Sequence, residues 1–428
     1  MMTLFLLLFI IVSLIIVKHY SLSILVNPFF WLITFWVLIT GVFFTSGINY
    51  KYGHSIGLYI FMALCVISLY WGVKKGNNCR LSIFRAEEKK LYITRYTLLG
   101  IIGCAVFCWD YIRLNGVATE KIASDISIIG SVGSLFVPIL LVLGLYMNAY
   151  SVRYCGKLSV AGIIMVLGYS LPCMLNAGRE AVLFGVIGIL SIYGYSHLLI
   201  KNNVINKSTK SSKKVILLTS VISILMYMAY LLIEISQSRF SDNEISVLLT
   251  YRDVSSSAML DAEKWGTFQF LYYNISSYFS HQLPFLDFTL REYDGPYLFG
   301  MYEFNIISRR LPDFMNLDYK IATQELHTLF NTKGESFAGG WNTVLGSFII
   351  DFTWVGAIIG CSVCGYFISI VKRKFMITYD PRYMTLLALF CLSTFSTIQL
   401  GPFFQTQIYG CYVWWYLLFR KEEKVLIC

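Results

Sequence analysis

Long apolar stretches separated by polar connections dominate the chain. Eleven of them are long enough to be read as membrane spans, since about 20 apolar residues cross the hydrocarbon core of a bilayer. The first lacks a positively charged start and a small-residue cleavage site, so we expect a span there and not a signal peptide. The pattern predicts an all-α polytopic integral membrane protein with about 11 transmembrane helices. They are expected at 2–17, 26–44, 56–73, 96–109 (extending back over 91–95), 126–149, 158–175, 181–200, 215–234, 352–370, 383–399 and 404–419.

One connection is much longer than the others and divides the chain into three parts. Residues 1–234 hold the first eight predicted helices, 235–350 form a large polar loop, and 351–428 hold the last three helices and a short tail. Because the loop is the main segment expected in water, we expect the chemistry of the protein at the face that carries it.

The loop is rich in aromatic residues, and part of it has helical periodicity. Apolar side chains recur three or four residues apart, which places them on one face of a helix over 258–281. This helix is expected either in the membrane–water interface or packed on the protein's own outer surface. The periodic residues are Trp265, Phe268, Tyr272, Ile275 and Phe279.

Composition and charge agree with a membrane protein and fix an expected orientation. Charged residues are 14% of the chain and hydrophobic residues 57%, whereas a soluble protein carries roughly a quarter charged residues. With the N-terminus outside and the C-terminus cytoplasmic, 22 of the 34 Lys and Arg lie in cytoplasmic connections. The net charge of +10 therefore reports topology and does not indicate nucleic-acid binding. The long loop is expected in the periplasm or at the cell exterior.

Ionisable residues at the outer ends of predicted spans are candidates for function, because charge near hydrocarbon is costly. Arg179 and Glu180 open the seventh span, Glu234 ends the eighth, and Asp351 lies at the outer boundary of the ninth. Gly178 would let the backbone beside Arg179 approach a ligand closely. Structural alternatives stay open for all four: a snorkelling arginine, an acid at a helix N-terminus, or an ion pair.

The long loop adds groups suited to an anionic substrate. Arginine makes forked contacts with phosphate, and the loop holds five arginines, each of which has a loop ion pair as its alternative. His281 has an ordinary pKa near 6.5, which suits a general base, although a structural histidine is the alternative. No metal site or cofactor is expected: none of the eleven cysteines lies in the loop, and the CxxC pair Cys361 and Cys364, inside an apolar span, is expected to consist of packing residues. The loop arginines are Arg239, Arg252, Arg291, Arg309 and Arg310.

This plan resembles the oligosaccharide repeat-unit polymerases of bacterial surface polysaccharides, the O-antigen polymerase (Wzy) family. The resemblance rests on the number of spans with one late external loop, on Gly178-Arg179-Glu180, and on the run Asn342-Thr343…Gly346…Asp351-Phe352…Gly356. Two departures are visible. Thr353 stands where many members have glycine, and no glycine follows Arg239, Arg252 or Arg291 at the distance of the Arg-x10-Gly loop signature.

The resemblance implies transfer of a growing glycan from its polyprenyl diphosphate carrier to the next lipid-linked repeat unit. Arg179 and Arg291 would bind the diphosphate, with Arg239 or Arg252 as a second clamp. His281 would be the base, with Glu180 as the alternative, and Asn342 and Asp351 would be further substrate contacts. The first loop expected outside the membrane, 45–55, has no Asp or Glu that could hold a metal ion. The enzyme is therefore expected to be metal-independent.

The resemblance also implies partners and a location. The substrate would be an undecaprenyl-diphosphate-linked oligosaccharide in the bacterial inner membrane, and the surrounding partners would be membrane lipids, a chain-length regulator and a flippase. Three other readings stay open: an O-antigen ligase, an exporter of lipid-linked oligosaccharide, and a membrane component without chemistry.

Overall fold

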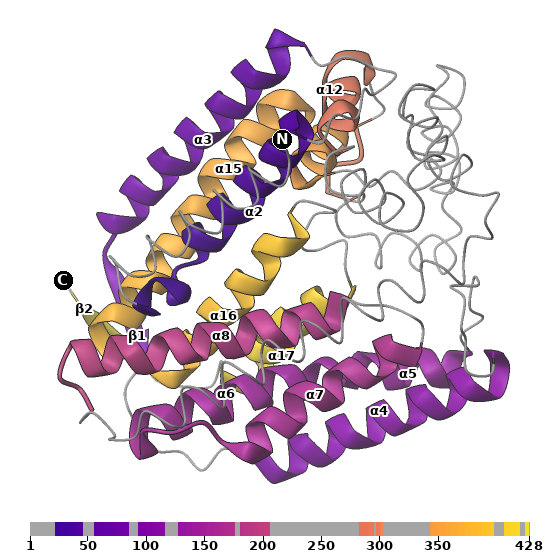
Figure 1. Ribbon diagram of the computed structural model, residues 1–428, viewed down its shortest axis with the longest axis vertical. Helices are drawn as coiled ribbons and strands as arrows, with labels where there is room; N and C mark the ends of the chain where they lie inside the picture. Colours follow the sequence, from indigo (N-terminus) through magenta and orange to yellow (C-terminus); the bar gives the residue numbers. More distant parts are fainter. Residues whose placement is uncertain are drawn as a thin grey trace.

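The computed structural model describes most of the predicted helices as helices (Figure 1). Five described helices are long and apolar enough to cross a membrane, and three shorter apolar helices accompany them. The predicted spans 2–17 and 215–234 and the predicted helix 258–281 lie outside the described residues. The described residues are 22–45, 55–84, 93–115, 127–175, 180–205, 282–294, 297–300, 302, 343–397, 406–419 and 424–427.

Helix boundaries agree with the hydrophobic pattern at most places, with three larger differences. The fourth predicted span continues to residue 115, the fifth, 126–149, is divided into two helices at Val137, and the ninth, 352–370, is preceded by helical structure from residue 344 and continues to residue 378. The helices are η1 (Leu22–Val26), α2 (Pro28–Thr45), α3 (Ile56–Asn77), α4 (Ile93–Asn115), α5 (Ile128–Phe136), α6 (Pro138–Cys155), α7 (Val160–Leu175), α8 (Glu180–Lys201), α12 (Gln282–Glu292), α15 (Val344–Thr378), α16 (Pro381–Ser396) and α17 (Thr406–Phe419).

Side chains that bind free backbone N–H groups fix where several helices begin. The hydroxyl of Ser55 accepts a hydrogen bond at the start of α3, and Ser127 and Thr343 do the same for α5 and α15. Asp380 caps α16 in the same way. Removing such a cap costs about 1 kcal/mol. Pro138 begins α6, a position where its missing N–H loses no helical bond.

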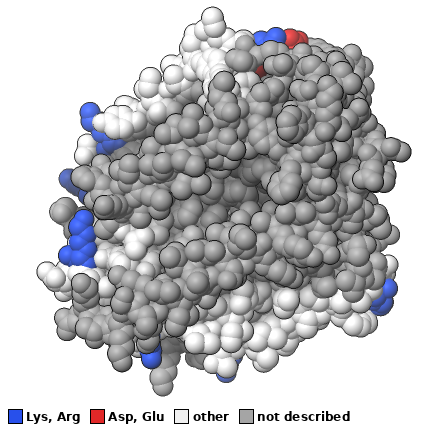
Figure 2. All heavy atoms as spheres, viewed as in Figure 1, with Lys and Arg blue, Asp and Glu red and all other residues white. Residues whose placement is uncertain are grey.

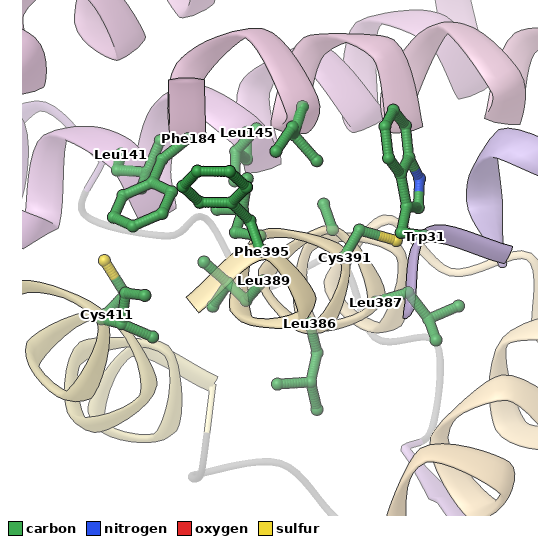
Figure 3. Packing of buried hydrophobic residues seen from close by; sticks show 14 of the residues in the cluster. Trp31, Leu141, Leu145, Phe184, Leu386, Leu387, Leu389, Cys391, Phe395 and Cys411 are labelled. Atoms are coloured by element: carbon green, nitrogen blue, oxygen red, sulfur yellow. The ribbon is translucent and has the colours of Figure 1, made fainter. Parts of the chain in front are cut away.

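Helix α16 lies at the centre of the described bundle and contacts α2, α6, α8, α15 and α17. All but one of its 16 residues are buried. Figure 3 shows side chains projecting from it in several directions, with Phe395 beside Phe184 of α8. The two rings meet edge to face, with centroids 6.4 Å apart. Its buried polar side chains are hydrogen-bonded, as burial requires: Thr385, Ser393 and Thr394 each donate to a carbonyl of the same helix.

Helices α3 and α15 form the most extensive helix pair, and small residues let their backbones approach closely. Ser68 donates a hydrogen bond across the interface to the carbonyl of Ile358 at 2.7 Å. Close approach through small residues is typical of helix packing in lipid. A Cβ atom at three glycines would overlap a carbonyl of the other helix: Gly72 with Ser362, Gly76 with Tyr366 and Gly365 with Leu69.

The outward faces of this pair are strongly apolar. Ile60, Val66 and Ile67 on α3 and Ile359 and Phe367 on α15 are each more than half exposed. Large exposed side chains of this kind are expected where lipid tails are the solvent. The described part of the chain is therefore a helical membrane protein.

The described fold includes a two-stranded antiparallel ribbon that the hydrophobic pattern does not predict. Strand β1 (Leu81–Phe84) follows α3, and β2 (Lys424–Ile427) lies in the tail, with Leu81 paired to Ile427. The ribbon joins the end of α3 to the C-terminal tail, so these two segments lie on the same side of the described structure (Figure 1).

Basic side chains are concentrated at one end of the helices. Lys74 and Lys75, Arg153 and Lys201 occupy the last turns of α3, α6 and α8. Figure 2 shows the blue Lys and Arg surface mainly along the left and lower edges. Within the described ranges, only Arg113 and Arg291 lie at the opposite ends of the helices, and each pairs with a buried aspartate. The distribution follows the positive-inside pattern.

Candidate functional site where α12 meets α3 and α15

The structure describes the side chains of two predicted site residues, Arg291 and Asp351. It places both near the junction of α12 with α15, two helices that are in contact. Glu180 is the first residue of α8, as its position before a predicted span implies, and its side chain is outside the described part. The other predicted site residues fall in undescribed ranges: Arg179, Arg239, Arg252, His281 and Asn342.

Helix α12 places Arg291 at this junction. Eight of its 11 residues are buried, and it contacts both α3 and α15. Pro284 lies in its first turn, where proline costs no helical hydrogen bond. The helix predicted from periodicity ends at residue 281, and α12 was not predicted. The available signal was the spacing of Asp287 and Arg291, four residues apart, which is typical of a helical ion pair.

Arg291 is held by the carboxylate one turn before it. Its Nε donates to Oδ2 of Asp287 at 3.1 Å, and its Nη1 lies 4.0 Å from Oε1 of Glu292. The Arg291 side chain is 44% exposed, while that of Asp287 is fully buried. A guanidinium has five N–H donors, so the bond to Asp287 leaves others for an anion. Arg291 thus combines a fixed anchor with an accessible charged edge.

Asp287 also holds the start of α3. Its Oδ2 accepts the backbone N–H of Ser55 at 3.0 Å, and its Oδ1 accepts the Ser55 hydroxyl at 2.5 Å. The three donors satisfy a carboxylate that would otherwise be costly to bury. Sequence reasoning missed both residues, although Ser55 directly before an apolar run is a recognisable helix start.

Asp351 lies inside α15 and not at its beginning. Its side chain is fully buried, and its Oδ1 accepts the backbone N–H of Tyr302 at 2.9 Å. Helical structure already starts at Val344, but it is interrupted at Thr353, next to the boundary that the sequence predicts at Asp351. The loop segment supplies the buried carboxylate with a hydrogen-bond donor, the backbone N–H of Tyr302.

Helix α15 is broken immediately after this aspartate. Thr353 has φ 72° and ψ 171°, a backbone conformation occupied almost only by glycine. Thr353 is also the position at which the sequence departs from the glycine of the resembling family. Its Oγ1 accepts the N–H of Gly356 at 3.4 Å, so the threonine caps the second part of the helix. A Cβ on Gly356 would overlap that of Phe352, which explains a glycine there.

The break exposes carbonyl groups that the loop then binds. Leu298 N–H donates to the carbonyl of Ile350 at 3.2 Å, and Phe299 N–H donates to that of Asp351 at 3.0 Å. Helix carbonyls without an internal partner need such donors when they are buried. The short segment 297–302 is therefore attached to α15 at three points, two through the backbone and one through the Asp351 side chain.

Tyr293 lies between the two aspartate sites in the chain. Burial raises the pKa of its hydroxyl above the ordinary value, and the nearby charges of Tyr297 and Asp351 raise it further. Its ring meets that of Tyr297 edge to face, with centroids 5.9 Å apart. The hydroxyl is therefore a neutral hydrogen-bonding group at neutral pH and not an anion.

A second aspartate uses the same chemistry at another helix start. Asp110 of α4 accepts the N–H and hydroxyl of Ser127 at 3.0 and 2.7 Å and pairs with Arg113 at 3.0 Å. Arg113 is 47% exposed and lies over the ring of Trp109. Because the arrangement occurs twice, the Ser–Asp–Arg clamp by itself indicates a structural link. The Asp287 clamp differs in joining the long loop to the bundle.

The described residues define a class of protein and do not identify a relative. They form a helical membrane protein with two buried aspartates, Asp287 and Asp351, and the half-exposed Arg291. Each aspartate accepts a backbone N–H group from another segment of the chain. Among the described residues, no group of three or more His, Cys, Asp or Glu side chains could hold a metal ion. Comparisons with protein-family models, curated proteins and solved structures found no match to the chain.

Proposed function

We propose that the protein is a metal-independent membrane glycosyltransferase that polymerises polyprenyl-diphosphate-linked oligosaccharide repeat units for a surface polysaccharide such as O-antigen or capsule. In this reaction the acceptor hydroxyl of one lipid-linked unit attacks the anomeric carbon of the growing glycan. The bond from that carbon to the diphosphate breaks, and polyprenyl diphosphate leaves with the bonding electron pair. A base takes the proton from the hydroxyl, and positioned cations stabilise the charge on the leaving group.

The observation that carries the proposal is the junction of α12 with α15. It brings α12, the helix that carries the half-exposed Arg291, into contact with α15, which contains most of the run that resembles the polymerase family. Within that run, Thr343 caps α15, Asp351 binds the loop and Gly356 accommodates the helix break. Each residue thus has a definite place in one local structure, in the manner expected of a functional motif.

The proposal includes the expected membrane arrangement of 11 spans, with the N-terminus outside, the C-terminus in the cytoplasm and the loop 235–350 in the periplasm. Two findings support it. The ribbon joins 81–84 to the tail, two segments that the charge pattern assigns to the same side. The basic side chains gather at the helix ends expected in the cytoplasm of a bacterial inner membrane (Figure 2).

The residue roles follow the chemistry of the reaction. Arg179 and Arg291 bind the diphosphate, with Arg239 or Arg252 as a second clamp. His281 takes the proton from the acceptor hydroxyl, with Glu180 as the alternative base. Asn342 lies directly before the capped start of α15 and would contact the glycan from there. A chain-length regulator and a flippase would work beside the enzyme.

The test is gel electrophoresis of surface polysaccharide from a strain that lacks the gene, beside the same strain complemented with it. A polymerase predicts that the ladder collapses to a single repeat unit on its anchor and returns on complementation. An unchanged ladder would contradict the proposal.

Two other patterns would assign the protein to the alternative classes. Polymer retained on the lipid carrier, with none on the anchor, would indicate a ligase. Single units trapped on the carrier inside the cell would indicate an exporter. Separating lipid-linked from anchor-linked glycan before electrophoresis distinguishes these cases.

A further inference from the structure

We propose that Asp351 is a positioning residue, whose buried carboxylate and broken helix fix the loop segment 297–302, and through it α12, against the membrane bundle. The consequence for catalysis rests on the proposed function, while the structural link itself does not. Asp351 then acts through the loop and does not touch the substrate.

The burial of the carboxylate is the first support. The side chain of Asp351 has no exposed surface, and one of its oxygens is used by the N–H of Tyr302 at 2.9 Å. A group that binds a glycan or a diphosphate directly has to reach it, whereas a group that organises a loop works best when buried. Hydrogen bonds to a carboxylate are also stronger than those between neutral groups.

The helix break is the second support, because it supplies the remaining attachment points. An unbroken α15 would satisfy the carbonyls of Ile350 and Asp351 internally, four residues further on. With the break at Thr353, they accept the N–H groups of Leu298 and Phe299 instead. Leu298 is buried at the contact, with 6% of its surface exposed. The break and the loop therefore satisfy each other's backbone groups.

The strain at Thr353 indicates that this arrangement is held against a cost. A non-glycine residue in this region of φ and ψ is strained and persists only where the surroundings hold it there. Here the surroundings are the three hydrogen bonds from the loop and the cap that Thr353 makes with Gly356. An uninterrupted helix would remove the strain, but it would also release the loop.

Two anchors therefore bracket Arg291 in the chain. Asp287 ties the middle of α12 to Ser55 at the start of α3, and Asp351 ties Tyr302, eleven residues after Arg291, to α15. Because the chain is attached to the bundle on both sides of Arg291, the position of this residue relative to the bundle is restricted. Positioning of this kind lowers the entropy cost of holding a substrate group in place.

The test compares Asp351→Ala with Asp351→Asn by hydrogen–deuterium exchange of the protein in lipid nanodiscs. The alanine removes the acceptor for the Tyr302 amide, and the asparagine keeps an oxygen acceptor without the charge. We expect the Tyr302 amide to exchange about tenfold faster or more in the alanine variant. In the asparagine variant we expect a change within about threefold of the wild type, because the acceptor is retained.

The polysaccharide ladder of the same variants supplies the second readout. Asp351→Asn should retain a ladder, while Asp351→Ala should lose polymer although the protein stays in the membrane. Asp110→Ala is the matched control. It also removes a buried, hydrogen-bonded aspartate, but the partner of Asp110 is Ser127 and not the segment 297–302. It should leave the exchange of the Tyr302 amide as in the wild type.

Two results would overturn the positioning role. One is an exchange rate of the Tyr302 amide in Asp351→Ala that equals the wild-type rate. The other is an asparagine variant that loses polymer as completely as alanine while 297–302 stays protected, since the charge itself would then act in the reaction. Should the gene deletion leave the ladder unchanged, the proposed function fails, and the exchange experiment still decides the structural link.

Discussion

Ser55 and Asp287 lie 232 residues apart in the chain and are joined by two hydrogen bonds. The serine caps α3 with the same hydroxyl that it donates to the aspartate, since its Oγ also accepts the N–H of Leu58. One side chain therefore serves both the start of a membrane helix and the attachment of the long loop. Ser127 and Asp110 repeat this geometry without involving that loop, which provides a natural control.

Replacing Ser55 with alanine should destabilise the protein and loosen α12. The change removes a cap and a hydrogen bond to a buried carboxylate, at a combined cost of about 2 kcal/mol. Ser127→Ala should lower the free energy of unfolding, measured in mixed micelles, by a similar amount. Only Ser55→Ala should speed amide exchange in 282–292. Equal exchange of 282–292 in both variants would show that the Ser55 bond does not hold the loop.

Replacing Gly72 with alanine should weaken the α3–α15 pair. The added Cβ would overlap the carbonyl of Ser362, and such overpacking typically costs about 1–3 kcal/mol. Gly168→Ala is the control, because its Cβ would meet only Leu140, at an ordinary distance of 3.7 Å. We expect Gly72→Ala to unfold in detergent at a lower temperature than the wild type, and Gly168→Ala to unfold at the wild-type temperature or above. A Gly72→Ala protein as stable as the wild type would contradict the close packing.

At Thr353 the usual order of alanine and glycine should be reversed. In an ordinary helix glycine is about 1 kcal/mol less stable than alanine, but at φ 72° and ψ 171° glycine carries no steric strain. Both substitutions remove the bond from Gly356 N–H to Oγ1, so their comparison isolates the backbone. We expect Thr353→Gly to be more stable than Thr353→Ala by about 1 kcal/mol or more. Alanine as the more stable variant would show that the helix is not broken there.

Arg291→Lys should impair polymerisation although it preserves the charge. Lysine keeps a cation near Asp287 but loses the planar fork that contacts a diphosphate at two points. We expect at least about a tenfold loss of long-chain polysaccharide, since one strong transition-state contact is worth that much or more. Arg113→Lys is matched in exposure and in its aspartate partner, and it should leave the ladder intact. Full activity of Arg291→Lys would remove Arg291 from the diphosphate site.

Reporter fusions should place the C-terminal tail and the end of α8 on the cytoplasmic side. A fluorescent protein fused after residue 428 should fluoresce, and one fused after residue 201 should do so too. Alkaline phosphatase fused after residue 300 should be active, because the charge pattern puts that segment outside. An active phosphatase after residue 428 would reverse the proposed orientation.

The positions of the helices could be predicted because each span has to satisfy its own backbone in lipid. A long apolar run in this setting can only be a helix or part of a barrel, so α3, α8 and α17 begin within a few residues of their predicted starts. The extent of α15 was harder to predict from the sequence. Its aspartate marked a boundary in the sequence, but the folded chain buries that carboxylate within the helix.

The sequence by itself determined the membrane class, most helix positions and two of the residues at the α12–α15 junction, Arg291 and Asp351. Hydrophobic runs and charge bias are local signals, and local signals are what a sequence displays directly. Only the tertiary structure decided that Asp287 holds Ser55, that 297–302 fills the break in α15, and that the tail pairs with Leu81–Phe84. These contacts join segments far apart in the chain, and their partners are polar groups whose pairing depends on how the helices pack. No periodicity along the chain records such a pairing, because it exists only after the spans have come together.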